Sequence, residues 1–259
     1  MKNVNDLSNI KGKVAIVTGS ATGIGQAIAV GLAEAGVDIA GTYSSTSFEE
    51  TKALVEAAGQ KFFPIHVNVA KPEEVATIIP LALKEYGKFD ILINSAGVES
   101  HNPIGDTYSE EEYQRCLQIN LNQVVALIAE AGKYFIKAGN GGRILNVSSI
   151  AGYLGMKSGM SPYVITKHAI RGVTRSFGLE LAPYGVTVNA IAPGPIFTKM
   201  TATTTTKKSM MDKVVAAKCP VGRWGFPEDF KGITNMLCSE AGGFITGQTI
   251  LVDGGYTLT

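Results

Sequence analysis

Short runs of apolar and β-branched residues recur along the chain, and polar or amphipathic stretches separate them. Most of these intervening stretches are long enough to form a helix. Strands that alternate with helices predict a parallel sheet, because parallel strands are joined by long crossovers that place helices on both faces. The pattern therefore predicts a doubly wound α/β fold of about seven strands, at residues 14–17, 37–42, 61–67, 89–93, 143–147, 186–191 and 249–252.

Candidate functional residues come directly after several of these strands. Gly19 follows the first strand, Asn94 the fourth, Ser149 the fifth, and Pro193-Gly194 the sixth. Ligands of open parallel sheets bind beyond the carboxyl ends of the strands. We therefore expect these residues to meet in one site at that edge of the sheet.

Composition narrows the class of protein. The chain has 259 residues, of which 45% are hydrophobic and 17% charged, and its formal net charge is +1. This favours one domain over residues 1–259, and the dispersed charge argues against nucleic acid or a membrane surface as a partner. Residues 1–13 are polar, and no apolar run approaches the roughly 20 residues that span a bilayer. We therefore expect a cytoplasmic protein.

Cysteine and histidine spacing indicates no metal site and no disulfide framework. Cys116, Cys219 and Cys238 are odd in number and widely separated, which favours buried reduced thiols. The three histidines lack the spacing of metal ligands, and His168 is expected to lie on the helix face away from the site.

A glycine-rich segment, Thr18-Gly19-Ser20-Ala21-Thr22-Gly23-Ile24-Gly25, lies between the first predicted strand and an Ala-rich helical stretch at 26–35. Glycine lets main-chain N–H groups approach a pyrophosphate, and the N-terminus of the following helix attracts the same anion. The segment therefore indicates dinucleotide binding, with a plain tight turn as the alternative.

Tyr163 and Lys167 are four residues apart in a segment, 161–181, whose apolar residues recur at helical spacing. Both side chains then lie on one helix face. A phenol is a poor base near neutral pH, but a nearby ammonium and a nicotinamide cation both favour the phenolate and lower its pKa. The pair is a candidate general acid/base, and a solvated surface pair is the alternative.

Taken in order, these motifs resemble those of the classical short-chain dehydrogenase/reductase family over residues 12–256. The resemblance implies a Rossmann fold and hydride transfer between a nicotinamide cofactor and an alcohol or ketone. The further elements that carry the resemblance are Asn94-Ser95-Ala96-Gly97, Asn120, Ser148-Ser149, Pro193-Gly194 and Val252-Asp253-Gly254-Gly255. In the first of these elements, Ser95 stands where the family has a second Asn.

The resemblance implies a role for each catalytic candidate. Tyr163 is the general acid/base, Ser149 orients the substrate oxygen, and Lys167 holds the ribose hydroxyls and lowers the pKa of the tyrosine. Asn120 helps to keep a water of a proton relay. Ser149 is preferred to Ser148 because it precedes Ile150-Ala151-Gly152.

The resemblance also implies the cofactor contacts, while the choice between NAD and NADP stays open. The second strand ends in Thr42-Tyr43-Ser44-Ser45, which lacks both the acidic residue that binds the NAD ribose and a basic residue that favours NADP. The expected cofactor-binding residues are Gly19, Thr22, Ile24, Gly25, Tyr43, Asn68, Val69, Asn94, Ala96, Gly97, Tyr163, Lys167, Pro193, Gly194, Ile196 and Thr198.

Three segments are candidates to face a small-molecule substrate, at 99–102, 153–159 and 199–211, the last within an expected mobile loop at about 198–215. Their polar residues, His101, Asn102 and Lys157, suit a sugar, sugar acid or polyol, whereas their methionines suit an acyl chain. The segments 36–39 and 223–225 resemble those of deoxygluconate and gluconate dehydrogenases. The alternatives are a 3-oxoacyl reductase and a dinucleotide sensor without turnover.

The carboxyl-terminal segment, 247–259, is apolar and glycine-rich. In the family such tails pack against a neighbouring subunit, so the resemblance implies a homotetramer. A buried edge strand is the alternative interpretation.

Overall fold

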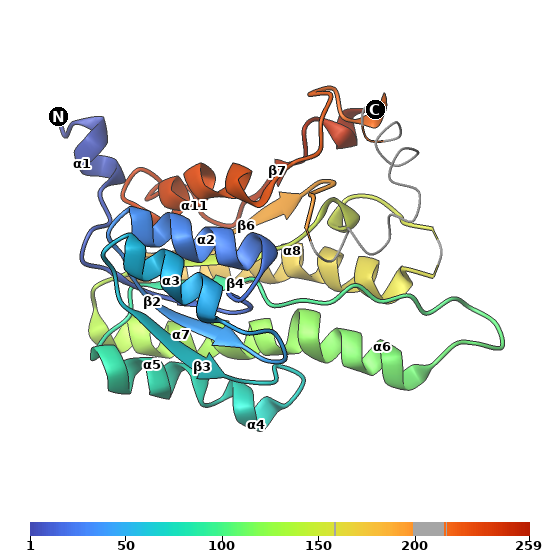
Figure 1. Cartoon of the computed structure of the whole chain (residues 1–259), viewed down its shortest axis with the longest axis horizontal. Helices are drawn as coiled ribbons and strands as arrows, with labels where there is room; N and C mark the ends of the chain where they lie inside the picture. Colours follow the sequence, from blue (N-terminus) through green and yellow to red (C-terminus); the bar gives the residue numbers. More distant parts are fainter. Residues whose placement is uncertain (158, 199–214, 216) are drawn as a thin grey trace.

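A parallel sheet forms the centre of the computed structural model, which describes residues 1–157, 159–198, 215 and 217–259. Its strands lie in the order β3-β2-β1-β4-β5-β6-β7 (Figure 1). The predicted α/β fold and each predicted strand are confirmed. The strands are β1 (Val14–Val17), β2 (Asp38–Tyr43), β3 (Phe62–His66), β4 (Ile91–Asn94), β5 (Gly142–Val147), β6 (Val186–Pro193) and β7 (Thr249–Val252).

Helices cover both faces of this sheet (Figure 1). One layer contains α2 (Gly23–Glu34), α3 (Glu49–Ala57) and α11 (Lys231–Cys238), and the other contains α5 (Ile78–Tyr86), α7 (Gln123–Ala138) and α8 (Ser161–Leu181). Side chains of β1 alternate between the two cores: Val14 and Ile16 pack with the α5, α7 and α8 layer, and Ala15 and Val17 with the other. This two-sided burial explains why the strands are continuously apolar.

Shorter elements connect these layers. A π-helical turn, η1 (Gln118–Asn122), joins α6 (Glu110–Leu117) to α7, and Figure 1 shows α6 projecting past the carboxyl ends of the strands. The remaining elements are α1 (Val4–Ser8), α4 (Pro72–Val75), η2 (Ile150–Gly152), η3 (Ala182–Tyr184), η4 (Pro227–Phe230) and η5 (Tyr256–Leu258).

The strand order reverses between β1 and β4, because the chain first winds from β1 to β2 and β3 and later continues on the other side of β1. Such a reversal opens a crevice at the carboxyl ends of the two strands. The three cysteines are buried and free, as predicted. Among the described residues, no helix is both long and apolar enough to cross a bilayer.

Candidate active site

The turn after β1 is bonded to both neighbouring strands. Thr18 Oγ1 accepts hydrogen bonds from the main-chain N–H groups of Ser95 and Ala96, each at 3.0 Å. The N–H of Gly19, which has a φ of +66°, donates to Thr42 Oγ1 at 3.0 Å. These bonds fix the main chain of the turn at the crevice between β1 and β4.

The same turn requires glycine where α2 begins. A Cβ on Gly25 would lie 2.2 Å from the Gly19 carbonyl oxygen and 3.0 Å from Ser95 Oγ, so a side chain has no room there. The N-cap residue of α2, Thr22, makes no capping hydrogen bond with its side chain. The first N–H groups of the helix therefore keep their capacity to bind an anion, which the helix dipole also favours.

A cavity of about 580 Å³ opens beside this turn. Its volume is within the range of small-molecule sites. The expected loop at about 198–215 lies outside the described residues, except for its two ends. The predicted site residues that line the cavity are Gly19, Thr22, Ile24, Gly25, Tyr43, Asn68, Val69, Ala96, Gly97, Ser149, Tyr163, Lys167, Pro193, Gly194, Ile196 and Thr198.

Two predicted residues, Asn94 and Asn120, are not among the lining residues that the structure describes. Asn94 is 2% exposed, and its Nδ2 donates to Asn146 Oδ1 at 2.8 Å. Asn146 Nδ2 donates in turn to Thr174 Oγ1 at 3.0 Å. The Asn94 side chain thus has a structural role, because it joins β4 to β5 and α8, and the contact of this residue with the cofactor stays a prediction.

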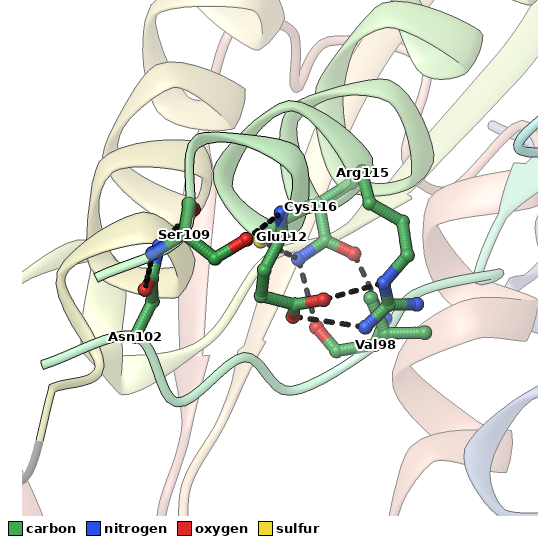
Figure 2. A network of polar contacts seen from close by, with 7 residues as sticks. Val98, Asn102, Ser109, Glu112, Arg115 and Cys116 are labelled. Carbon is green, nitrogen blue, oxygen red and sulfur yellow. Dashed lines mark hydrogen bonds and ion pairs between the residues drawn. The ribbon is translucent and has the colours of Figure 1, made fainter. Parts of the chain in front are cut away.

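The charge of the cavity suits a polyanion. Among the described lining residues, the charged ones are Arg115 and Lys167, and neither Asp nor Glu is present. Arg115 was not predicted. Its Nε and Nη2 donate to the Glu112 carboxylate at 2.7 and 2.9 Å, as Figure 2 shows. A pyrophosphate fits the uncapped helix and the narrow glycine turn.

Lys167 lies beside the phenol of Tyr163. Its Nζ is 5.5 Å from the centroid of the tyrosine ring and donates to the Val147 carbonyl oxygen at 2.9 Å. Burial lowers the pKa of Lys167 to about 8. Burial also raises the pKa of Tyr163 to about 12, while a hydrogen bond with Ser149 acts in the opposite direction. The expected lowering of the tyrosine pKa by lysine is therefore not found for the protein groups alone, in which loss of solvation is the largest cause of the shift.

The two serines after β5 have different partners. Ser148 Oγ donates to the Lys167 carbonyl oxygen at 3.1 Å and so anchors the strand end to α8. Ser149 Oγ accepts from the Ala151 N–H at 3.1 Å, which leaves its hydroxyl hydrogen available to another acceptor. The geometry therefore supports the choice of Ser149 as the residue beside the reacting oxygen.

Asn120 acts on the main chain next to the cavity. It is 1% exposed and lies in the π-helical turn, a type of distortion frequent at functional sites. Its Oδ1 accepts from the Val98 N–H at 2.8 Å and its Nδ2 donates to the Val98 carbonyl oxygen at 2.9 Å. A Cβ on Gly97 would lie 3.3 Å from Asn120 Oδ1 and 3.7 Å from Lys167 Nζ. Asn120 thus fixes the position of the Val98 main chain, which follows Gly97 beside Lys167.

The predicted substrate-facing residues separate into two groups. Glu99 pairs with His101 at 3.5 Å, and its negative charge raises the pKa of Tyr163. Asn102 is instead 3% exposed and exchanges two hydrogen bonds with the main chain of Ser109, so it is a structural residue (Figure 2). Segment 199–211 lies outside the described residues.

A glycine turn at an uncapped helix, together with serine, tyrosine and lysine in one cavity, defines a dinucleotide-dependent oxidoreductase. A family model described as enoyl-(acyl carrier protein) reductase matches residues 19–257. The chain belongs to the short-chain dehydrogenase/reductase family, and it is an NAD(P)-dependent alcohol dehydrogenase or ketoreductase.

Individual relatives match nearly the whole chain. The chain is 38% identical over 253 residues to a 2-dehydro-3-deoxy-D-gluconate 5-dehydrogenase of Bacillus subtilis, with 98% of each chain covered. It is 36% identical to a 3-oxoacyl-[acyl-carrier-protein] reductase of Staphylococcus aureus (strain Mu50), with 94% of this chain and 97% of the relative covered. A solved structure from Agrobacterium tumefaciens, described as a 2-deoxy-D-gluconate 3-dehydrogenase with bound NADP, has a TM-score of 0.87 and 30% identity, with 98% of this chain and 100% of that chain covered.

Proposed function

We propose that this protein interconverts a secondary alcohol and a ketone of a sugar, sugar acid or polyol, with Tyr163 and Ser149 at the reacting oxygen. The observation that carries the proposal is the meeting of Ser149, Tyr163 and Lys167 in one cavity beside the glycine turn. The relatives named for deoxygluconate support the carbohydrate class.

The proposed cofactor is NAD or NADP, held at its pyrophosphate by the Gly19–Gly25 turn and the N-terminus of α2. A nicotinamide dinucleotide accepts or supplies the hydride when bound. Tyr43 lines the cavity together with the neighbouring hydroxyl residues Ser44, Ser45 and Thr46, so the end of β2 offers neutral donors to either ribose form. The assay described below uses both cofactors and therefore determines whether the protein prefers NAD or NADP.

The protein groups divide the proton chemistry among them. In alcohol oxidation, the Tyr163 phenolate takes the hydroxyl proton as the substrate carbon loses its hydride. Ser149 donates its remaining hydroxyl hydrogen to the same substrate oxygen. One Lys167 N–H is used by the Val147 carbonyl, and the others are available to the ribose hydroxyls and to proton exchange. Asn120 holds the adjacent main chain in place.

The test is a panel of sugar acids, polyols, ketoses and 3-oxoacyl thioesters, each assayed with both nicotinamide cofactors and followed by absorbance. We expect turnover of carbohydrate substrates to exceed that of acyl substrates. Preferential reduction of the 3-oxoacyl thioesters would instead assign the alternative activity, for which the Staphylococcus aureus relative is the precedent.

Turnover itself is tested by Tyr163→Phe. We expect cofactor affinity within about twofold of the wild type and a loss of turnover of about 100-fold or more, because the variant lacks the acid/base group. Equal turnover would refute the role of Tyr163. A protein that binds the cofactor tightly but turns over no member of the panel would be a dinucleotide sensor.

We also propose that the protein assembles as a homotetramer. β7 lies at an edge of the sheet, and Phe244 and Leu258 nearby in the sequence are 104% and 84% exposed. Exposed large apolar side chains beside a free strand edge favour association with a second copy. Light scattering after size-exclusion chromatography measures the molar mass, and a monomeric mass would contradict the proposal.

A further inference from the structure

A buried threonine next to Lys167 connects two parts of the site that lie far apart in the sequence. Thr166 is 0% exposed. Its Oγ1 donates to the Tyr163 carbonyl oxygen at 2.7 Å and accepts from Asn120 Nδ2 at 3.2 Å. A single hydroxyl therefore joins the π-helical turn to the first part of α8, where Tyr163 begins the active-site face.

A threonine that bonds back to a carbonyl of its own helix is common and needs no function. Thr166 differs because that back-bond uses its hydroxyl hydrogen and leaves only acceptor capacity, which the Asn120 amide fills. The other partners of Asn120 Nδ2 are the Val98 carbonyl oxygen at 2.9 Å and the weakly accepting Cys116 Sγ at 3.4 Å. Thr166 is thus the link between this amide and the catalytic helix.

The link continues to the lysine. Asn120 holds both main-chain polar groups of Val98, and the preceding residue, Gly97, adjoins both Asn120 Oδ1 and Lys167 Nζ. A shift of Asn120 would therefore move the main chain that borders the ammonium group. Because the main chain at Gly97 is closely packed against Lys167, small displacements of it alter the surroundings of Lys167 and Tyr163.

We propose that Thr166 is a positioning residue, whose hydroxyl fixes Asn120, and through it the Val98 main chain, relative to Tyr163 and Lys167. The expected effect on catalysis rests on the proposed function, whereas the hydrogen-bonded link itself does not. The groups that face the Tyr163 and Lys167 pair are Ser149, Glu99 and Cys116. None of these residues is substituted in the test, although the Thr166 hydroxyl also acts on Cys116, whose pKa it lowers.

The chain offers a matched control on the same helix. Thr174 is also 0% exposed, donates to the Ile170 carbonyl oxygen at 2.7 Å and accepts from Asn146 Nδ2 at 3.0 Å. It therefore repeats the hydrogen bonding of Thr166 two turns further along α8, with an asparagine of β5 instead of Asn120. Thr174→Val removes an equivalent hydroxyl, whose hydrogen bonds lead through Asn146 to Asn94 and not to Asn120, Tyr163 or Lys167.

The experiment compares Thr166→Val, Thr166→Ser and Thr174→Val in the full chain, by kcat, KM and the pH profile of kcat. For Thr166→Val we expect kcat to fall about tenfold, KM to change less than about twofold, and the pH profile to shift. Thr166→Ser should recover kcat to within about twofold, and Thr174→Val should keep the wild-type profile despite lower stability to urea. If Thr166→Val does not fold, Thr166→Ala removes the same hydroxyl and is assessed in the same way.

Two results of the kinetic comparison would overturn the inference. One is a wild-type kcat and pH profile in Thr166→Val. The other is an equal loss of activity in Thr166→Val and Thr174→Val, which would show a general effect of stability. Hydrogen exchange of the Val98 amide, measured by NMR, is independent of turnover. The exchange should accelerate in Thr166→Val alone, and unchanged protection would refute the link between Thr166 and Val98. Absence of turnover with every substrate would instead count against the proposed function.

Discussion

The ammonium of Lys167 is held by the Val147 carbonyl at the end of β5, with its Nζ 5.5 Å from the centre of the Tyr163 ring. Only 6% of Lys167 is exposed. Burial lowers the pKa of Lys167 to about 8 and raises that of Tyr163 to about 12, so at neutral pH the lysine remains mostly an ammonium and the tyrosine a neutral phenol. A phenolate at neutral pH therefore requires additional positive charge, which an oxidised nicotinamide ring supplies when bound.

The lowered pKa of Lys167 predicts a pH-dependent stability. The unfolded lysine has a pKa near 10.5 and the folded one about 8, so the unfolded chain binds more protons between these values and stability rises with pH. Relative to Lys167→Met, the wild type should gain about 1.5 kcal/mol between pH 8 and pH 9.5. Urea unfolding of both proteins at each pH measures this difference, in which the contributions of the buried thiols cancel. A constant difference would contradict the buried ammonium.

Removal of the Ser149 hydroxyl should move alcohol oxidation to higher pH. The hydrogen bond from Ser149 stabilises the phenolate and so lowers the pKa of Tyr163. In Ser149→Ala the pKa of Tyr163 in the free enzyme should rise, and the increase of kcat/KM with pH should begin at a more alkaline pH. The pH profiles of kcat/KM, which report the free enzyme, measure the shift in wild type and variant. A shift toward acid pH would show that Ser149 does not stabilise the phenolate.

Glu99 should have the opposite effect. Its negative charge raises the pKa of Tyr163, and it is paired with His101 at 3.5 Å. Glu99→Gln removes this charge with little change of shape, so the phenolate should form at lower pH and oxidation at pH 8 should be faster. The same pH profiles, recorded beside those of Ser149→Ala, test the sign. Slower oxidation at pH 8 with unchanged KM would refute a purely electrostatic role.

The fold and most of the cavity could be predicted because their signals are local. Strands β1, β4 and β6 are buried along their whole length, and strand ends of a parallel sheet meet at one edge. Ser149 follows one strand, and Tyr163 and Lys167 share the face of a single helix, so their meeting follows from short segments of sequence.

What sequence reasoning missed depends on contacts between distant segments. The register of β4 and β5 pairs Asn94 with Asn146, which gives the Asn94 side chain a structural link that the sequence did not indicate. Arg115 follows three consecutive glutamates, a pattern typical of a solvated helix, and it lines the cavity only because α6 passes the strand ends. A signal that would have found Arg115 is its position four residues before Ile119, which also lines the cavity. The pKa of Tyr163 likewise required the burial that only the packed structure supplies.

The glycine turn provides the sharpest test of the cofactor site. In Gly25→Ala the new Cβ would lie 2.2 Å from the Gly19 carbonyl oxygen. The turn must move, because the main chain fixes the position of the Cβ and the oxygen is itself a main-chain atom. We expect a loss of about 2 to 3 kcal/mol in the free energy of unfolding and a loss of dinucleotide binding. Gly232→Ala is the control, because nothing lies within 4 Å of its Cβ position in α11 and alanine favours a helix by roughly 0.5 to 1 kcal/mol. Urea unfolding and calorimetric titration with NAD and NADP measure both properties. Wild-type dinucleotide affinity in Gly25→Ala would place the cofactor elsewhere, whereas a loss in both variants would show that binding responds to any change of stability.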